Sequence, residues 1–222
     1  MSKKARAVGH EGYSRVRSFG SEIHFGSVVS GARGALAGCF DGPIIGQGAS
    51  ISFPLGSSHA VLQAGEPIIL DLITVVNGYQ IDQTRLMAIG NLSPELLAAH
   101  QTALEVEERL RLAMVPGRIA GEVYEEMVTW VKENTPYEQN FMGFGPKRVG
   151  FVGHGVGLEL DELPVIGRGA KEVLATGMVV AIEPKIVFPG VGAVGIEDTV
   201  VIEGTEGARY LSLSPRNPII VG

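Results

Sequence analysis

The sequence has a single cysteine, Cys39, among its 222 residues, which excludes an internal disulfide. So little cysteine fits a reducing compartment, and we expect a cytoplasmic protein. No apolar run approaches the roughly 20 residues that a membrane-spanning helix needs. The basic N-terminal residues are not followed by the apolar segment of a secretory signal. The sequence therefore predicts a protein with neither a membrane span nor a signal peptide.

The sequence also has fewer basic residues than acidic ones. Lys and Arg total 18 against 24 Asp and Glu, which gives a formal net charge of −6 and an isoelectric point near 5.4. Nucleic acids and anionic membranes select basic surfaces, so we expect neither as a partner. Apolar residues make up 45% of the chain, which is ordinary for a globular protein with a sizeable core. Since no Pro-, Ser- or charge-rich linker divides the sequence, we expect one domain over residues 1–222.

Several segments are predicted to be strands. Residues 66–76 (EPIILDLITVV) are apolar and β-branched, and Asn77-Gly78 follows directly before YQIDQTRLMAI. Asn-Gly suits a two-residue type I′ turn, so these runs predict a hairpin. Residues 178–188 and 193–204, joined by PGVG, predict a second hairpin. The glycine-rich residues 26–56 predict strands, tight turns and a long loop that shapes a pocket.

Helices are predicted between the two hairpins. Ser93-Pro94 has the features of a helix start, and Pro116-Gly117 would end that helix. Apolar residues at every fourth position predict a second helix over about 119–133. A third, short helix is expected near 170–175. Strands, helices and strands in this order, with antiparallel hairpins, favour an α+β fold.

The first hairpin would bring two acids together. If the turn is Asn77-Gly78, Ile73 faces Asp82 and Asp71 faces Thr84, so that Asp71 and Asp82 become diagonal neighbours on one face. Such neighbours lie roughly 7 to 8 Å apart at the backbone, and both carboxylates could reach a shared ion. Without a cation, two acids on the buried face of an apolar hairpin would be costly.

The last hairpin can bring two further acids together. With residues 189–191 as the turn, Phe188 faces Gly192 and Glu183 faces Glu197. Like charges placed directly opposite destabilise a sheet, so this pair needs a counter-charge. A four-residue loop would instead place the two glutamates on opposite faces, and the sequence leaves that alternative open.

These four carboxylates predict a metal site. Two divalent cations would neutralise them, and His154, which lies between Gly153 and Gly155, can supply a nitrogen ligand. Carboxylates with one imidazole suit Mn, Co, Zn or Fe. Two metals bridged by carboxylates typically hold a water or hydroxide as the nucleophile, so the predicted chemistry is hydrolysis.

Each of these residues also has a simpler interpretation. His154 could be a structural or surface histidine, Asp82 could pair with Arg85, and Glu183 could be a surface residue at a strand end. The metal hypothesis depends on the set, because each acid interrupts a strongly apolar strand.

The strings LDLITVVNGYQIDQTR, GHGVGLELDELP and AIEPKIVFPGVGAVGIEDTVVI resemble the M24 metallopeptidases, the family of methionine aminopeptidase, aminopeptidase P and prolidase. The similarity covers most of the chain from about residue 60 and, more loosely, from about residue 12. It implies the pita-bread fold, which is a curved antiparallel sheet with flanking helices, and a short peptide as the substrate.

The resemblance also implies roles for individual residues. The ligands of two divalent metal ions would be Asp71, Asp82, His154, Glu183 and Glu197. Asp82 and Glu197 would bridge the ions, and Asp71 would bind one ion alone. His154 and Glu183 would complete the other, and Glu183 would also handle the proton of a metal-bridging hydroxide that attacks the peptide carbonyl. The glycines beside His154 would leave room next to a ligand at the floor of the cleft.

Three positions depart from the family pattern. Where family peptidases usually have a substrate-binding histidine shortly after the ligand histidine, this chain has Asp161. Two functional roles are open for Asp161: its surroundings could keep it protonated, or its charge could attract a substrate amine, and in either case it would be a catalytic and substrate-binding residue. The alternative is that Asp161 is only a surface or helix-capping acid. A second family histidine is expected near Gly38 or Cys39, and His59 is the candidate substitute. The arginine common in proline-directed members is replaced by Gly195.

The helical pair that usually opens the family's catalytic domain, and the N-terminal domain of larger relatives, have no counterpart in the sequence. The chain is therefore expected to be a fragment or a reduced member that forms a homodimer. Our leading interpretation is an exopeptidase of the Xaa-Pro aminopeptidase or dipeptidase type. The alternatives are a metal-dependent hydrolase of a small non-peptide amide, suggested by the missing histidines and arginine, and a non-catalytic binding module.

Overall fold

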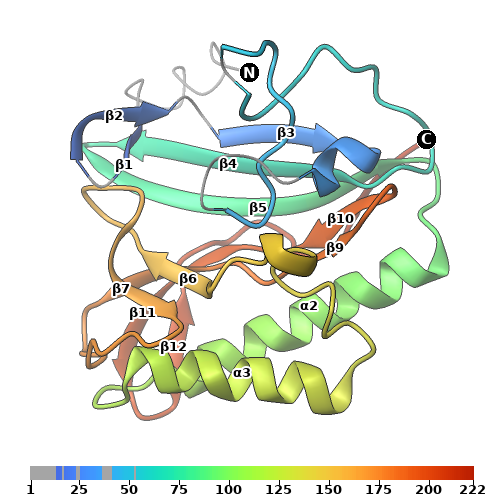
Figure 1. Ribbon diagram of the computed structural model, residues 1–222. Coiled ribbons are helices and arrows are strands. Elements are labelled where there is room, and N and C mark those ends of the chain that lie inside the picture. The colour runs from blue at the N-terminus through green and yellow to red at the C-terminus, as the bar shows by residue number, and fades with distance from the viewer. Residues whose placement is uncertain (1–13, 17, 24–25, 37–41, 53) are drawn as a thin grey trace.

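The protein is an arrangement of two main sheets and two long helices. The computed structural model describes residues 14–16, 18–23, 26–36, 42–52 and 54–222. One sheet has the strand order β13-β5-β4-β3, and the other has the order β12-β11-β8-β6-β7. In Figure 1 the two sheets form adjacent layers, and helices α2 and α3 lie beyond the second sheet. The predicted α+β class is confirmed.

The elements have the following bounds. The strands of the first sheet are β3 (Gly26–Ser30), β4 (Ile68–Val76), β5 (Tyr79–Ile89) and β13 (Ile219–Val221). Those of the second are β6 (Phe151–Gly155), β7 (Glu162–Gly167), β8 (Val179–Ile182), β11 (Asp198–Gly204) and β12 (Gly207–Tyr210). Two separate pairs are formed by β1 (Ser14–Val16) with β2 (Ser18–Ile23) and by β9 (Lys185–Phe188) with β10 (Gly192–Gly195). The helices are α2 (Pro94–Ala113) and α3 (Ala120–Asn134), with short 3-10 turns η1 (Gly31–Ala35) and η2 (Gly145–Lys147).

The first hairpin has the predicted turn and register. Asn77-Gly78 joins β4 to β5 with φ values of 53° and 77°, both in the left-handed region that a type I′ turn requires. Ile73 pairs with Asp82, and Asp71 pairs with Thr84. The prediction from Asn-Gly is therefore confirmed residue by residue. The sheet is not purely antiparallel, however, because β13 joins β5 in parallel.

The last hairpin also has the predicted register. Phe188 pairs with Gly192 in β9 and β10, and the same register resumes between β8 and β11. Glu183 and Glu197, which lie between these two paired regions, are therefore opposite each other. The four-residue loop that would have separated them is excluded.

The expectation of two continuous strands in this hairpin is wrong. Each strand is divided in two, one at Glu183-Pro184 and the other at Ile196-Glu197. Pro184 has no N–H to donate to a ladder, and the Glu183 N–H donates to the Val152 carbonyl of β6 instead of across the hairpin. The interruption lies at the two glutamates that matter for the site.

The helices begin and end close to the predicted residues. Ser93 caps α2, because its side chain accepts a hydrogen bond from the Leu96 backbone N–H, and Pro94 occupies the first turn. The third helix expected near 170–175 is wrong. That segment is extended, and it exchanges backbone hydrogen bonds with the loop before α3, as when Ala120 N donates to the Glu172 carbonyl. Tertiary pairing therefore overrides the helical composition of this short segment.

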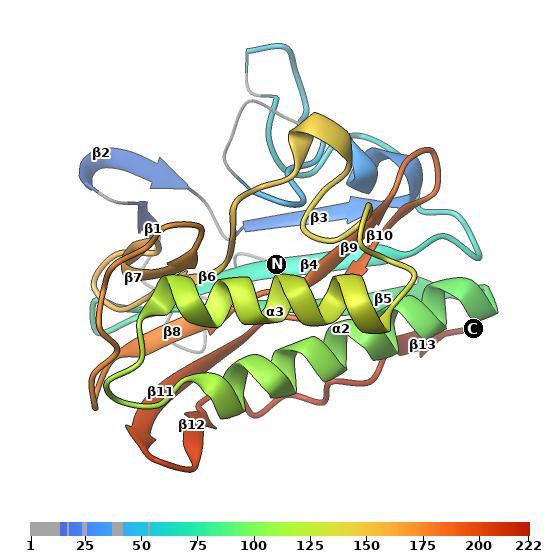
Figure 2. The same ribbon diagram turned by 60° about the horizontal axis from the view of Figure 1, so that its bottom comes forward.

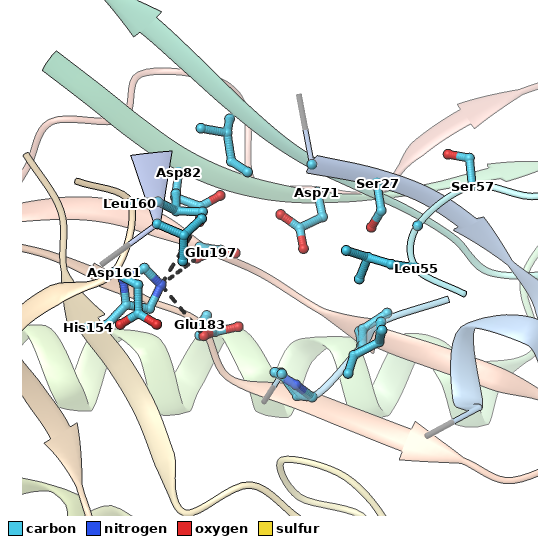
Figure 3. Close-up of a pocket in the computed structure, with 18 of the residues that line it drawn as sticks. Ser27, Leu55, Ser57, Asp71, Asp82, His154, Leu160, Asp161, Glu183 and Glu197 are labelled. Atoms are coloured by element: carbon cyan, nitrogen blue, oxygen red, sulfur yellow. Dashed lines mark ion pairs between the residues drawn. The ribbon is translucent and has the colours of Figure 1, made fainter. Parts of the chain in front are cut away.

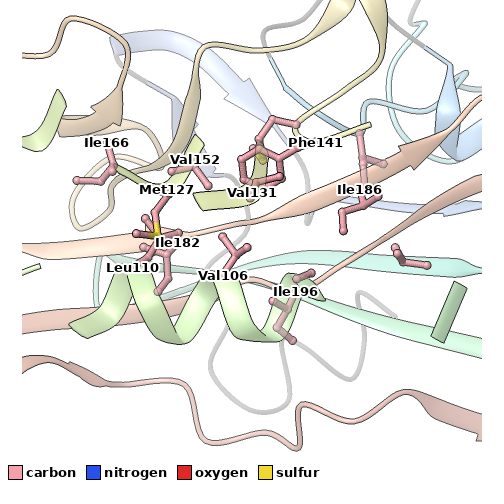
Figure 4. Close-up of a cluster of buried hydrophobic side chains, with 14 of the residues drawn as sticks. Val106, Leu110, Met127, Val131, Phe141, Val152, Ile166, Ile182, Ile186 and Ile196 are labelled. Atoms are coloured by element: carbon pink, nitrogen blue, oxygen red, sulfur yellow. The ribbon is translucent and has the colours of Figure 1, made fainter. Parts of the chain in front are cut away.

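The main hydrophobic core lies between the helices and the second sheet (Figure 4). Val106 and Leu110 of α2 and Met127 and Val131 of α3 are almost fully buried against it. Figure 2 shows the two helices side by side across this face. None of the helices in the described residues is long and apolar enough to cross a membrane. The helices therefore cover one face of the second sheet, and the first sheet lies against its opposite face.

Candidate metal centre

The two aspartates lie on the first hairpin and face a cavity of about 330 Å³ (Figure 3). Asp71 is in the middle of β4, and Asp82 is four residues into β5. Asp82 is almost fully buried, whereas Asp71 is partly buried. Asp82 does not pair with Arg85, whose guanidinium instead lies 2.6 Å from Asp198. The carboxylate of Asp82 is therefore left to the cavity.

The two glutamates enter the same cavity from the interrupted last hairpin. Glu183 turns its backbone N–H to the carbonyl of Val152 in β6, 2.9 Å away. Glu197 and Thr84 exchange backbone hydrogen bonds of 3.3 Å in both directions, so this residue links the two main sheets. Glu183 and Glu197 are both almost fully buried, which excludes a surface role for Glu183. The break in the strands is what allows each glutamate to bond to a neighbouring sheet element.

His154 lies on β6 and presents one ring nitrogen to the acids. Its Nδ1 is 3.1 Å from the carbonyl oxygen of Gly155. A carbonyl can only accept, so Nδ1 carries a proton, and in the neutral ring the lone pair is on Nε2. Nε2 lies on the side of the carboxylates, as a metal-binding imidazole requires.

The glycines beside His154 lie against the backbone of neighbouring strands. A Cβ on Gly153 would lie 2.6 Å from the carbonyl oxygen of Ala181, and one on Gly155 would lie 2.5 Å from that of Leu163. These glycines therefore allow the neighbouring strands to approach β6, and the expectation that they make room beside a ligand stays a prediction.

The donor atoms surround a volume suited to one divalent ion. His154 Nε2 is 3.9 Å from Asp82 Oδ2, 3.9 Å from Glu183 Oε1 and 4.0 Å from Glu197 Oε1. Bonds from Zn to nitrogen or carboxylate oxygen are about 2.0 to 2.2 Å long, so ligand atoms on one such ion lie roughly 3 to 4 Å apart. Asp82, His154 and Glu197 offer donors within 4.8 Å of one another. Asp82 Oδ1 is buried without a hydrogen-bond partner among the described residues, which also fits a cation.

Burial and mutual repulsion raise the pKa values of three acids in this cluster, which favours the binding of a cation. Burial, and then the charge of Glu197, raise the pKa of Asp71 to about 7 and that of Asp82 well above its ordinary value. Burial also raises the pKa of Glu183 to about 7, although the ammonium of Lys185 opposes the rise. Burial lowers the pKa of His154, but the charges of Glu183 and Glu197 outweigh it and the net shift is upward. These carboxyls resist ionisation together, and a bound cation would remove that resistance.

Two residues of the site were not identified from the sequence. Thr84 Oγ1 donates a 2.7 Å hydrogen bond to Glu197 Oε2. Lys185, which is completely buried, places its Nζ 3.1 Å from the same oxygen and 3.3 Å from Glu183 Oε2. The position of Thr84 opposite Asp71 was predicted from the sequence, but its contact with Glu197 was not. Lys185 lies two residues after Glu183 in AIEPKIVF, and alternation along a strand would have placed the two side chains on the same face.

Of the two candidate substrate-binding residues, Asp161 lies at the site and His59 does not. Asp161 lines the same cavity as the five candidate ligands, and its charge acts on His154. His59 is exposed and lines another hollow, with Arg33 and Gln47 among its neighbours. The structure therefore brings Asp161 to the site but does not bring His59 there. Gly38 and Cys39, the expected place of a family histidine, lie outside the described residues.

The cavity walls are mostly apolar, and the glycine-rich segment forms part of them. Ile44, Ile45 and Leu55 from this segment face Ile73 and Leu160 across the cavity. The prediction that residues 26–56 include a loop that shapes a pocket is confirmed. An apolar enclosure around a few convergent polar groups is typical of a small-molecule site.

The chain was compared with known families, curated proteins and solved structures. The sequence model of Metallopeptidase family M24 matches residues 5–204. The Xaa-Pro dipeptidase of Pyrococcus furiosus is 34% identical over 184 residues, which are 82% of this chain and 50% of that protein. The Xaa-Pro dipeptidase of Pyrococcus horikoshii is 30% identical over 187 residues, 84% of this chain and again 50% of the relative. The chain thus spans about half the length of these curated relatives.

Solved structures agree with the sequence comparisons. The X-Pro aminopeptidase from Thermotoga maritima has a TM-score of 0.77 and 26% identity, and the match covers 97% of this chain and 51% of that one. The prolidase from Pyrococcus furiosus has a TM-score of 0.73 and 28% identity, with 95% of this chain and 52% of that one covered. The pita-bread fold expected from the sequence is confirmed.

Proposed function

Because the chain belongs to metallopeptidase family M24, we propose that it is a metal-dependent exopeptidase of the Xaa-Pro dipeptidase or aminopeptidase type. The observation that carries the proposal is the convergence of Asp82, His154, Glu183 and Glu197 on one enclosed cavity. The names of the relatives, Xaa-Pro dipeptidase and prolidase, support a short peptide as the substrate. Since the chain spans only about half of these relatives, the activity of the whole protein is part of the proposal.

The residues of the cavity have separable roles in this reaction. Asp82, His154, Glu183 and Glu197 would hold a divalent ion, which would supply a Lewis acid for the carbonyl and lower the pKa of a bound water. Glu183 lines the same cavity with its Oε1 3.9 Å from His154 Nε2, where its carboxylate would accept the proton that a water releases. Asp161 offers a carboxylate on the cavity wall, and we propose that it attracts the substrate amine. The apolar walls lower the local dielectric and so strengthen these interactions.

A second candidate is the hydrolysis of a small non-peptide amide. The observation that favours it is that His154 is the only histidine among the described residues lining the cavity. The substrate-binding histidines implied by the resemblance have no substitute there, because His59 lies elsewhere. The same metal chemistry would then act on a smaller carbonyl compound.

The finer expectations stay predictions. They are the number of metal ions, expected to be two, their identity as Mn, Co, Zn or Fe, the ligand role of Asp71, the homodimer, the cytoplasmic location, and residues 1–222 as a single catalytic domain. The absence of a nucleic-acid or membrane partner also stays a prediction.

The test is a peptide panel with purified protein and added Mn or Co. The panel contains Xaa-Pro dipeptides, Xaa-Pro-Yaa tripeptides and Met-Xaa dipeptides, with small non-peptide amides alongside. We expect turnover of a proline peptide by the wild type, none by His154→Ala or Glu183→Ala, and an unchanged rate for His59→Ala. Turnover of amides alone would favour the second candidate, and full activity of His154→Ala would refute the metal assignment.

The variant Asp161→His separates the two roles of that position. If Asp161 occupies the place of a substrate-binding group, the histidine should increase the rate on dipeptides without changing the amount of bound metal. An unchanged substrate profile would show that Asp161 does not contact the substrate.

A further inference from the structure

Lys185 is a buried cation built into the metal centre. It is the first residue of β9 and is completely buried, and its ammonium bonds to two of the candidate ligands. Gly195, its partner across the hairpin, makes room for it, since a Cβ there would lie 2.5 Å from Lys185 Cδ. A Cβ at Gly195 would also lie 2.6 Å from the Pro184 carbonyl oxygen, so the close approach of these two strands requires glycine as well.

The two oxygens of each glutamate face different partners. Glu183 Oε1 and Glu197 Oε1 lie 3.9 and 4.0 Å from His154 Nε2. Their Oε2 atoms face Lys185 Nζ, at 3.3 and 3.1 Å. One side of each carboxylate is thus directed at the histidine, and the other side is directed at the lysine (Figure 3 shows the histidine side).

Glu197 Oε2 is already saturated. It accepts from Thr84 Oγ1 at 2.7 Å and from Lys185 Nζ at 3.1 Å. A carboxylate oxygen has two lone-pair sites, so these two donors use both. Glu197 Oε2 is therefore not free for a second metal ion while Oε1 faces His154. A second ion bound by this oxygen would have to displace the ammonium of Lys185, which is fully buried.

The charge balance points the same way. The four carboxylates alone would need two divalent cations for neutrality. With the positive charge of Lys185 included, one divalent ion removes most of what remains. The ammonium of Lys185 lies 3.3 Å from Glu183 Oε2 and 3.1 Å from Glu197 Oε2, so two carboxylates compensate its charge.

We propose that Lys185 takes the place of one of the two expected cations, so that the chain binds a single divalent ion among Asp82, His154, Glu183 and Glu197. The inference rests on the proposed metal-dependent function, and it revises the expected number of ions. Lys185 is a positioning residue in this scheme, because it acts through the carboxylates and does not touch the substrate. Asp71 remains on the cavity wall as a carboxylate available for other contacts.

The test is the number of Mn²⁺ ions per chain, measured by calorimetric titration of chelator-treated protein and by elemental analysis after dialysis. Electron paramagnetic resonance adds an independent result, because two bridged Mn²⁺ ions are spin-coupled and a single ion is not. We expect one uncoupled ion in the wild type. We expect two coupled ions in Lys185→Met, which keeps the length of the side chain and removes its charge, and one ion in the charge-conserving control Lys185→Arg.

The outcomes distinguish this inference from the proposed function. Two ions in the wild type, or one ion still in folded Lys185→Met, would overturn the role of Lys185 and leave a metal-dependent hydrolase intact. No bound ion in the wild type would overturn the proposed function together with this inference. If Lys185→Met does not fold, the wild-type stoichiometry and spectrum alone decide between one ion and two.

Discussion

Replacement of Thr84 by valine tests how firmly Glu197 is oriented toward the metal. Thr84 is completely buried, and its hydroxyl donates to Glu197 Oε2 over 2.7 Å. Valine has nearly the same shape but cannot donate. A hydrogen bond to a charged group contributes about 1.5 to 3 kcal/mol, and about 1.4 kcal/mol corresponds to tenfold in affinity. We therefore expect the dissociation constant for Mn²⁺ to rise by roughly 10- to 100-fold. Because Lys185 still holds the same oxygen, the lower end of this range is expected.

The assay is calorimetric titration of Mn²⁺ into metal-free protein, with urea denaturation of the same samples as a measure of stability. Thr84→Ser is the matched control, because it keeps the hydroxyl and removes only a methyl group. It should bind the metal with close to wild-type affinity. If Thr84→Val also binds Mn²⁺ as the wild type does, the hydrogen bond does not orient Glu197 and the reasoning is refuted. If both variants lose affinity equally, packing rather than hydrogen bonding is responsible.

Three further predictions concern the surroundings of the site. Gly195→Ala should lower the free energy of unfolding by about 1 to 3 kcal/mol in urea, because its methyl group would collide with Lys185; an unchanged midpoint would mean that the strands adjust freely. Arg85→Met should lower the free energy of unfolding by about 1.5 to 3 kcal/mol, since it removes the guanidinium 2.6 Å from the buried Asp198 but leaves Arg216 3.4 Å away, and a loss below 1 kcal/mol would contradict this. The pKa of Glu183 is raised to about 7, so below that pH an incoming metal must displace a proton. Because the pKa values of Asp82 and His154 are raised as well, metal affinity measured by titration should fall at least tenfold per pH unit below about pH 7, and a flat profile from pH 5 to 8 would refute the shift.

The features that sequence reasoning recovered are those set by local geometry. Asn77-Gly78 permits only a tight turn, and strand alternation then dictates that Asp71 faces Thr84. The turn at residues 189–191 determines in the same way that Glu183 and Glu197 are opposite each other. Register propagates from a turn over many residues, so the acidic pairs could be located before the fold was known.

The features that were missed depend on contacts between distant segments. The segment 170–175 is extended because it pairs with the loop before α3, about fifty residues earlier in the chain, and no local pattern encodes that partner. Gly153 and Gly155 are required by the close approach of neighbouring strands. Lys185 was overlooked because a lysine in a strand is usually solvated, and only the packed structure shows that its ammonium is enclosed by acids.

The hydrogen bond between Thr84 and Glu197 joins residues 113 positions apart, and this separation has a consequence for protein synthesis. The aspartates are translated early, but Glu197 is the last of the candidate ligands in chain order. A nascent chain cannot assemble the donor set until the final hairpin has emerged from the ribosome and docked between the sheets. Metal capture is then a late event that distinguishes finished molecules from interrupted ones, and products truncated before this residue would remain without a complete site.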